Sequence, residues 1–279
     1  MRSAVRLGAG PGFAVDEVTC VDDHRDWSAT EVNSGYRVVL VQRGRFRRMA
    51  DGRPADVDAT AAYLGVPGEE EHFAHPSGGD VCTSLGLSGT LWRALAGESR
   101  PTRPTVYVDA RLDLAHRRFL AAARSGDPAF ALTESLLPLI GLTLTRSSPT
   151  EGASGGPAPT RPRHRSRTSA PHAIVDAARE AIAADHPAAD GLLSLAELLG
   201  VSPYQLSRAF TRELGVSLTH FRNRVRVGRA LDRLESGEPS LATLAADLGF
   251  ADQAHLTRTV RHHLGHTPTA LRRLLATAT

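Results

Sequence analysis

The spacing of apolar residues divides the chain into two parts of different character. Across residues 13–108, short apolar runs are separated by glycine, proline and aspartate turns about every 8–12 residues, which is typical of a sandwich or small barrel. From Asp109 onward, apolar residues recur at helical spacing. The predicted class is therefore α+β, with the strands first. The predicted strands span residues 36–41, 45–49, 61–66, 81–87 and 105–108.

Two helices are predicted directly after the strands. The first begins after Asp109 and has one apolar face. Gly126-Asp127-Pro128 separates it from a second helix that is apolar nearly all round. Such a helix is expected to be buried in its own domain or against a second subunit. Pro138 lies inside it and is expected to kink it or end it early.

A degenerate repeat occupies the last 90 or so residues of the chain. The segment 196–200 (AELLG) returns 49 positions later as 245–249 (AADLG), and Leu206-Ser207-Arg208 returns 50 positions later as Leu256-Thr257-Arg258. Each copy predicts a short helix, a tight turn at glycine, and a longer helix with arginine and hydroxyl groups facing outward. This is the order of a helix-turn-helix, whose second helix enters the DNA major groove.

Helix-capping residues support this division. Ser194, followed three residues later by Glu197, is expected to start the first short helix as a capping box. Ser202 and Asp252 are expected to cap the two longer helices, and Ser240 the second short one. A long arginine-rich helix over residues 218–235 joins the two copies.

The distribution of charge agrees with DNA binding by the repeat. All 33 basic residues are arginine, and the formal net charge is +3. Residues 1–160 carry a net charge of −2, whereas residues 161–279 carry +5. A basic surface on the repeat is what a nucleic-acid-binding domain requires.

The segment 146–171 is rich in proline, glycine and serine and contains a run of arginines, which predicts a flexible linker. We therefore expect an N-terminal domain over residues 1–145, the linker, and a DNA-binding domain over residues 172–279. Two cysteines do not make a disulfide framework, no apolar run reaches the ~18 residues of a membrane span, and no signal peptide is evident. The expectation is a cytoplasmic protein with reduced thiols and no membrane association.

Residues 193–273 resemble the DNA-binding domain of the AraC/XylS family of bacterial transcription regulators. The resemblance rests on Ala245-x2-Leu248-Gly249-Phe250-x-Asp252, Leu256-Thr257-Arg258, Gly265-x-Thr267-Pro268-x3-Arg272 and Arg226-x3-Ala230. It implies two helices that read successive major grooves of double-stranded DNA. The residues expected at the DNA are Tyr204, Gln205, Ser207, Arg208, Thr211 and Arg212 in the first copy, and Ala254, His255, Thr257, Arg258, Arg261 and His262 in the second.

Two positions depart from the family pattern, and one expected DNA-facing residue is poorly suited to hydrogen bonding. Val260 stands where an aromatic residue is common, and Leu218 where proline is common. Val260 is expected to loosen the packing of the second copy. Ala254 has no hydrogen-bonding group, so direct reading of bases is expected to be weaker in that copy.

The N-terminal half is similar to the cupin-like sensor and dimerisation half of the same family. This rests on its layout and on residues 64–69 (LGVPGE) followed by His72. The resemblance implies a β-barrel or jelly roll that takes a small-molecule effector, two helices within residues 110–144 that pair two subunits into a homodimer, and contact with RNA polymerase, more often for activation than for repression. Effector contacts are guessed at Trp27, Tyr36, Tyr63 and His72, although core packing explains them equally well.

Cys20-x3-His24 and His72-x2-His75-x6-Cys82 leave three interpretations open. Cys20, His24, His75 and Cys82 would suit a tetrahedral zinc site if they met in space. The two cysteines would also suit a thiol-based redox sensor. Alternatively, they are buried cysteines that pack as small apolar side chains.

A cupin enzyme fused to a DNA-binding module is the remaining alternative. The sequence lacks the His-x-His and following glutamate of a metal cupin, and it has no nucleophile elbow, P-loop or dinucleotide fingerprint. We therefore expect no catalytic activity. The sequence names neither the effector nor the promoter nor the sign of regulation.

Overall fold

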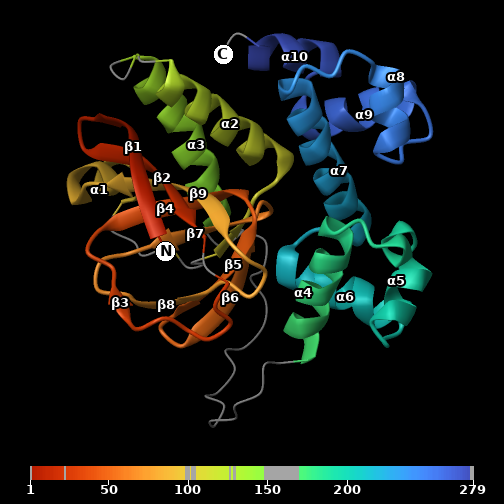
Figure 1. The fold of residues 1–279 in the computed structure, drawn as a ribbon, viewed down its shortest axis with the longest axis horizontal. Coiled ribbons are helices and arrows are strands. Elements are labelled where there is room, and N and C mark those ends of the chain that lie inside the picture. Colours follow the sequence, from red (N-terminus) through yellow and green to blue (C-terminus); the bar gives the residue numbers. More distant parts are fainter. Residues whose placement is uncertain are drawn as a thin grey trace. The chain divides into compact units, whose positions relative to one another are not determined.

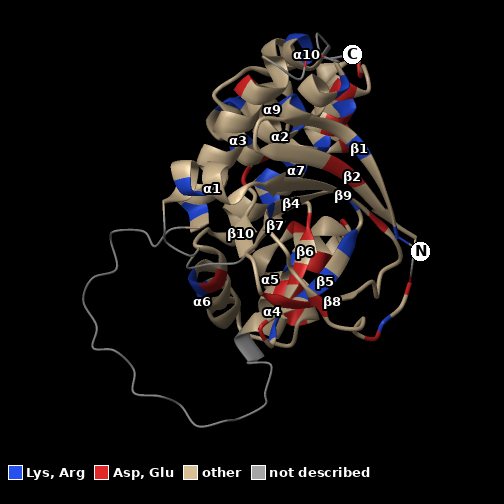
Figure 2. Ribbon diagram, turned by 90° about the vertical axis from the view of Figure 1, so that its left-hand side faces the viewer, with Lys and Arg blue, Asp and Glu red and all other residues tan. Residues whose placement is uncertain are grey.

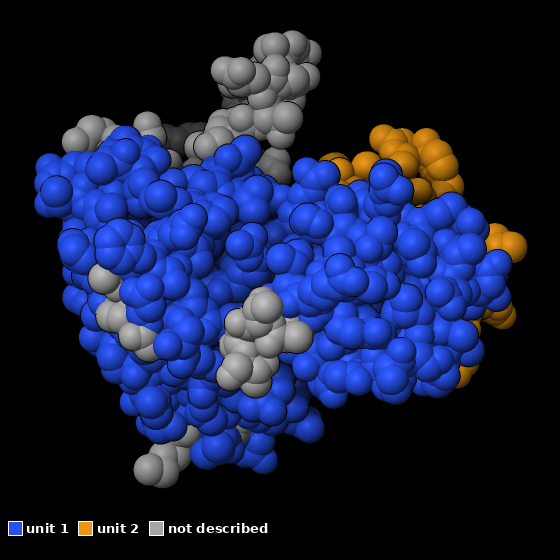
Figure 3. All heavy atoms as spheres, turned by 90° about the horizontal axis from the view of Figure 1, so that it is seen from above, with its two compact units in different colours: residues 1–149, 230–279 blue, residues 150–229 orange. Residues whose placement is uncertain are grey.

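The computed structural model describes residues 2–21, 23–97, 101, 105–125, 127, 130–147 and 170–276. Most of the predicted linker, including its arginine run, and the expected helix start at Pro128 lie outside these residues. The chain divides into two compact units, Met1–Pro149 with Ala230–Thr279, and Thr150–Arg229 (Figure 3). None of the helices in the described residues combines the length and apolar character needed to cross a membrane.

The N-terminal part of the first unit consists of two antiparallel sheets and three helices (Figure 1). The six-stranded sheet has the order β1-β2-β9-β4-β7-β10, and the four-stranded sheet the order β3-β8-β5-β6. The strands are Arg2–Gly10 (β1), Phe13–Cys20 (β2), Glu31–Val32 (β3), Tyr36–Arg43 (β4), Arg45–Ala50 (β5), Arg53–Asp58 (β6), Ala61–Gly65 (β7), Glu70–Ala74 (β8), Asp80–Leu87 (β9) and Thr105–Tyr107 (β10).

The centre of the six-stranded sheet is buried on both faces, which explains the apolar run at residues 38–41 of β4. Successive side chains of a strand point to opposite faces. Val38 and Leu40 therefore join the core beneath the helices, while Val39 and Val41 pack toward the four-stranded sheet. Residues 38–41 are buried whichever face they point to, so this stretch shows no polar alternation.

Three helices cover the outer face of the six-stranded sheet: α1 (Gly89–Ala96), α2 (Ala110–Arg124) and α3 (Ala131–Ser147). The side chain of Asp109 caps α2 by accepting from the amide of Leu112 at 2.9 Å. Contrary to the expectation of an early end, α3 continues through Pro138 for nine more residues. Pro138 is exposed, so the Glu134 carbonyl that loses its helical partner faces water.

The four-stranded sheet meets the six-stranded sheet through buried ions. β5 is rich in arginine, whereas β8 begins with two glutamates (Figure 2). The Arg48 guanidinium, 2% exposed, donates to Glu71 Oε1 at 2.6 Å and to Glu69 Oε2 at 2.5 Å. Arg37 of β4 donates to the other oxygen of Glu71. We refer to Arg37, Arg48, Glu69 and Glu71 as the buried ion network; it links the two sheets.

We expect Arg48→Met to lower the free energy of unfolding by about 3–5 kcal/mol, because two buried carboxylates lose their shared counter-ion. Both tryptophans, Trp27 and Trp92, lie in the N-terminal part, so urea unfolding followed by tryptophan fluorescence reports this region. Arg53→Met at an exposed position is the matched control and should change stability by less than ~0.5 kcal/mol. Equal effects of the two substitutions would contradict a stabilising role for the network.

A buried histidine attaches α2 to the six-stranded sheet. His116 Nε2 lies 2.7 Å from Thr83 Oγ1 of β9, and the same oxygen accepts from Gln42 Nε2 at 3.0 Å. Burial lowers the pKa of His116 from 6.5 to about 4, since the charged form would lose its hydration. The imidazole is therefore neutral in the folded protein throughout the neutral range.

This histidine should make stability depend on pH. Between pH 6.5 and 4 the unfolded chain binds a proton that the folded chain does not, so stability is complete above pH 6.5 and falls as the pH drops. We expect a loss of about 2 kcal/mol between pH 7 and 5 from this group. Urea unfolding of wild type and His116→Gln at both pH values isolates it. Identical pH dependence in both proteins would show that His116 does not contribute.

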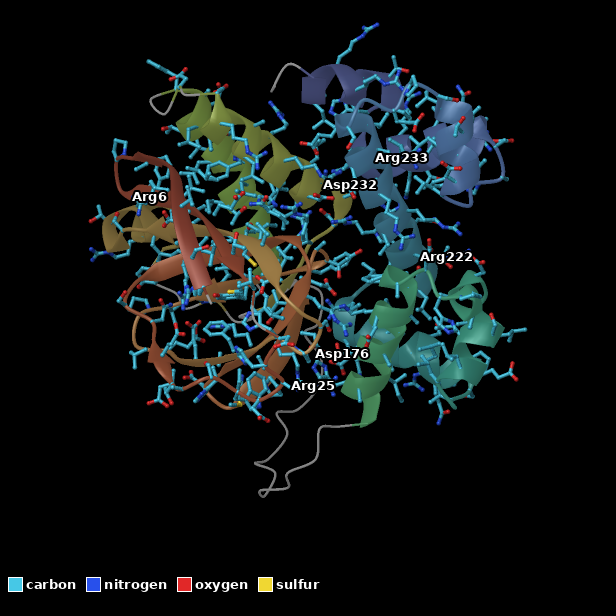
Figure 4. The ribbon with its side chains drawn as sticks, in the orientation of Figure 1. Arg6, Arg25, Asp176, Arg222, Asp232 and Arg233 are labelled. Carbon is cyan, nitrogen blue, oxygen red and sulfur yellow. The ribbon has the colours of Figure 1, made fainter. Side chains whose placement is uncertain are left out.

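The C-terminal helices are anchored by arginines of the long helix α7 (Leu218–Glu235), which has the predicted bounds. In the second unit, with α4 (Ala170–Ala183) and the 3-10 turn η1 (Pro187–Asp190), Arg222 donates to Asp190 at 2.7 Å and Arg229 pairs with Asp185 at 2.7 Å. In the first unit, Arg233 pairs with Glu238 and, at 3.2 Å, with Asp247. Arg222 and Arg233 are labelled in Figure 4. These arginines of α7 are thus engaged in structural ion pairs.

Candidate nucleic-acid interface and internal cavity

The first helix-turn-helix consists of α5 (Leu192–Leu198) and α6 (Pro203–Leu214). Gly200 has a φ of 64°, which permits the tight turn between them. Ser202 caps α6 by accepting from the Gln205 amide, and Gln205 in turn accepts from the Ser202 amide at 3.0 Å. The predicted capping box at Ser194 is wrong: α5 begins after Gly191, and the Ser194 hydroxyl donates to the carbonyls of Ala188 and Gly191.

The second helix-turn-helix has the same construction. Its helices are α8 (Leu241–Asp247) and α9 (Gln253–Leu264), and Gly249 at the turn has a φ of 68°. Ser240 caps α8 and Asp252 caps α9, as predicted; the Asp252 carboxylate accepts from the amide of His255 at 2.6 Å. α10 (Pro268–Ala276) follows α9 in the same unit.

The two longer helices have identical lengths and matching ends. Both contain 12 residues, begin at a side-chain cap and end at a glycine with positive φ, 72° at Gly215 and 75° at Gly265. Counting from the caps therefore aligns their residues position by position. The aligned pairs are Tyr204 with Ala254, Gln205 with His255, Ser207 with Thr257, Arg208 with Arg258, Thr211 with Arg261, and Arg212 with His262.

The cores of the two longer helices use the same positions. Leu206 and Phe210 of α6 are fully buried, as are Leu256 and Val260 at the aligned positions of α9. Phe210 packs edge to face against Phe221 of α7, with ring centroids 5.2 Å apart. Val260 is 1% exposed, so it is buried in the core of the second helix-turn-helix, although an aromatic residue is common at this position.

A cavity of about 230 Å³ is lined by residues of both N-terminal sheets. Its wall includes Arg37 and Val39 of β4, Phe46 of β5, Tyr63 of β7 and Phe73 of β8. Residues of the six-stranded sheet in this wall lie on the face opposite the helices, and Phe46 and Phe73 come from the four-stranded sheet. The cavity is thus apolar in part, with charged groups at intervals.

One wall of the cavity carries a cluster of sulfur, imidazole and carboxylate groups. In the pairing of β2 with β9, Cys20 lies opposite Asp80 and Val18 opposite Cys82. All four side chains therefore share the cavity face. His75, just after β8, brings Nε2 to 3.0 Å from Asp80 Oδ1. Cys20, His75 and Asp80 offer ligand atoms that all lie within 4.8 Å of one another.

The charges in this cluster are set by Asp80 and by burial. Hydrogen bonds with Asp80 and then with Cys20 raise the pKa of His75 from 6.5 to about 9. Burial, followed by the nearby Asp80 charge, raises the pKa of the Cys82 thiol above its ordinary value. At neutral pH, His75 is therefore an imidazolium paired with the Asp80 carboxylate, and the protonated Cys82 thiol donates to Asp80 Oδ2 at 2.8 Å.

Comparison with known proteins identifies the C-terminal segment. The model of the helix-turn-helix domain family of AraC type matches residues 195–274. The chain carries an AraC-type helix-turn-helix domain. The resemblance of residues 193–273 to the DNA-binding domain of the AraC/XylS family is thereby confirmed over this segment.

The relatives share the AraC-type domain. An uncharacterised helix-turn-helix transcriptional regulator of Staphylococcus aureus (strain MSSA476) is 35% identical over 77 residues, which is 28% of this chain and 10% of that protein. The arabinose operon regulatory protein of Escherichia coli (strain K12) is 30% identical over 81 residues, 29% of this chain and 28% of that protein. The chain thus spans less than a third of these relatives.

Among solved structures, the C-terminal domain of AraT, a response regulator from Geobacillus stearothermophilus, is 34% identical, with a TM-score of 0.34. The match covers 36% of this chain and 84% of that domain.

Within the AraC-type domain, most residues expected at the DNA are exposed. The exposed ones are Tyr204, Gln205, Arg208, Thr211, Arg212, Ala254, Arg258, Arg261 and His262, whereas Ser207, His255 and Thr257 are half-buried. Gln205 and His255 each accept from a backbone amide at the start of their helix. Gln205 Oε1 accepts from the Ser202 amide at 3.0 Å, and His255 Nδ1 accepts from the Ala251 amide at 3.3 Å. His263 of α9 is buried, at 8% exposure.

Arg208 differs from Arg258 in having a neighbouring ring of its own helix. The Arg208 guanidinium lies 5.4 Å from the centroid of the Tyr204 ring and donates to the Tyr204 hydroxyl at 3.1 Å. Both side chains remain exposed. The tyrosine thus restricts the arginine's orientations before any partner is bound.

The four guessed effector residues have different surroundings. Tyr63 lines the cavity. Tyr36 lies on the opposite face of its sheet, stacked on Trp92 at 4.6 Å. Trp27 lies beneath Arg47, and His72 hydrogen-bonds Ser28 and Thr30, so neither contributes to the cavity wall. Asp80 was missed, although its place two residues before Cys82 in one strand puts both on one face.

Proposed function

We propose that this chain is a sequence-specific, effector-responsive transcription regulator of the AraC/XylS type. The observation that carries the proposal is the pair of equally long, equally capped helices, each with a row of exposed polar and basic side chains, inside the AraC-type domain. Such helices present side chains to base edges in the major groove. A regulator of this kind acts on chromosomal DNA, so we place it in the cytoplasm.

The N-terminal half is proposed to be a cupin-like sensor domain, with the linker at 146–171 joining it to the DNA-binding domain. The cavity between the two sheets supports a small-molecule effector, because its lining combines apolar side chains with charged groups that could orient a ligand. A ligand that binds one conformation more tightly shifts the population toward it. We infer a sensing rather than a catalytic role, in keeping with relatives that are transcription regulators.

We further propose a homodimer that acts on RNA polymerase, with activation more common in this family than repression. Support for dimerisation comes from α3, where Leu137 is 54% exposed, and from Phe130 just before it, which is 79% exposed. Apolar side chains this accessible favour association with a second surface. Two subunits would double the DNA contacts and raise the affinity through effective concentration.

Arg208→Ala should weaken binding to the specific site by about 1–3 kcal/mol and relax selection at one base position, because a bidentate contact to guanine is lost. Arg208→Lys keeps the charge but not the planar fork, so it should also relax selection. Footprinting and affinity measurements on the upstream region of the chain's own gene, at several salt concentrations, supply the data.

Arg93→Ala removes the same charge from exposed α1 and serves as the matched control, with affinity expected to stay constant. The following result would show that Arg208 has a different role. If Arg208→Lys binds like wild type while Arg208→Ala loses affinity equally on specific and random DNA, Arg208 contacts phosphate and does not read a base.

A further inference from the structure

We propose that the N-terminal domain binds one zinc-class divalent ion through Cys20 Sγ, a ring nitrogen of His75 and the carboxylate of Asp80. These residues come from three places in the sequence, the end of β2, the residue after β8 and the start of β9. Each is buried, at 9%, 6% and 5% exposure. The site is independent of the proposed reading of DNA.

The three ligand atoms are close enough for one ion. All lie within 4.8 Å of one another. Zinc bonds of about 2.0–2.3 Å in tetrahedral geometry separate ligand atoms by roughly 3.5 Å, so only side-chain adjustment is needed. The strand pairing supplies two ligands without any loop movement, since Cys20 and Asp80 are directly opposite each other on neighbouring strands.

The remaining atoms of two ligands already have partners, as metal ligands usually do. Cys82 Sγ donates to Asp80 Oδ2 at 2.8 Å. His75 Nδ1 lies 3.3 Å from His24 Nε2, and the other nitrogen of His24 contacts the Asp26 carbonyl at 2.9 Å. Asp80 Oδ1 is buried and lies 3.0 Å from His75 Nε2, the imidazole nitrogen that pairs with it. The ligand atoms of Cys20, His75 and Asp80 thus lie close to one another, while the second side-chain atoms of His75 and Asp80 have partners outside the group.

The donor set selects the class of ion. Thiolate and imidazole favour zinc and its neighbours among the transition metals, whereas calcium and magnesium require oxygen ligands. Three protein ligands leave one tetrahedral position open, as in zinc sites that bind water or a small ligand. All three residues line the cavity, so the open position is accessible to a cavity ligand.

Strand register argues against a disulfide between the two cysteines. Cys20 pairs with Asp80 and Cys82 with Val18, so the cysteines are diagonal neighbours. Diagonal positions are about 7–8 Å apart, beyond the usual limit of about 7 Å between the Cα atoms of a disulfide. The same register that separates the sulfurs places Cys82 where it supports Asp80.

Cobalt substitution on the full chain tests the site, because Co²⁺ adopts zinc geometry and reports thiolate ligation by a sulfur-to-cobalt charge-transfer band. Chelator-treated wild type should develop this band with one equivalent of Co²⁺ and lose it when Zn²⁺ is added. Cys20→Ser should abolish the band. Cys82→Ser, the matched change of the other thiol, should retain it, since serine can still donate to Asp80.

Loss of the band in Cys82→Ser with retention in Cys20→Ser would overturn the assignment, as would absence of the band in wild type. X-ray absorption of zinc-loaded wild type needs no variant: one sulfur at about 2.3 Å with nitrogen or oxygen neighbours is expected, and no sulfur or two sulfurs would refute the site. Asp80→Asn should weaken zinc binding at least tenfold. DNA footprinting of the same samples is scored separately, so failure of this site and failure of the regulator proposal are distinguishable.

Discussion

A guanidinium group with no access to water fixes the arrangement of the N-terminal domain. Arg48 can be buried only where carboxylates surround it, because an unpaired charge in the interior costs several kcal/mol. Glu69 and Glu71 meet that need from one sheet, and Arg37 extends the contact to the other. Apolar side chains could slide past one another with small loss, whereas these directional contacts permit a single registration of the two sheets. The cavity exists because the sheets are held at that registration.

The alternation of side chains along each strand then determines which face of the sheet each residue occupies. On strands β2, β4, β7 and β9 of the six-stranded sheet, one set of residues packs under α1, α2 and α3, and the other set faces the cavity. His116 and Thr83 belong to the helix side, and Cys20 and Asp80 to the cavity side, although Thr83 lies only three residues after Asp80. A shift of one residue between β2 and β9 would send the cysteine and the carboxylate to opposite faces. Core packing and cavity chemistry therefore depend on the same register.

Features specified by nearby residues could be predicted from the sequence. The caps at Ser202, Ser240 and Asp252, the turns at Gly200 and Gly249 and the bounds of α7 depend on contacts a few residues apart. Ser194 has the same local pattern, yet its hydroxyl serves the carbonyls of the preceding turn, a competition that the pattern does not reveal. Strand β8 and the place of Asp80 opposite Cys20 depend on distant pairing, which one sequence does not specify. Strands β1 and β6, which pair with their sequence neighbours, and helix α1, which Ser88 caps, are local features that the sequence analysis missed. Tyr36 is an example: as a polar residue in a strand it was proposed to contact the effector, but it lies on the face of β4 opposite the cavity and stacks on Trp92.

The two helix-turn-helix units share their geometry but differ in what they present. In the first, Tyr204 both orients Arg208 and offers a hydroxyl of its own. In the second, Ala254 stands at the aligned position, so Arg258 has no ring beside it from that position. Restricting an arginine before binding reduces the entropy lost when it meets a base, and this favours discrimination over mere attraction. In the proposed regulator, the exposed Arg258, Arg261 and His262 would be available to the phosphate backbone. In the proposed regulator, the first helix-turn-helix would then select the DNA sequence, and the second would hold the protein on the DNA.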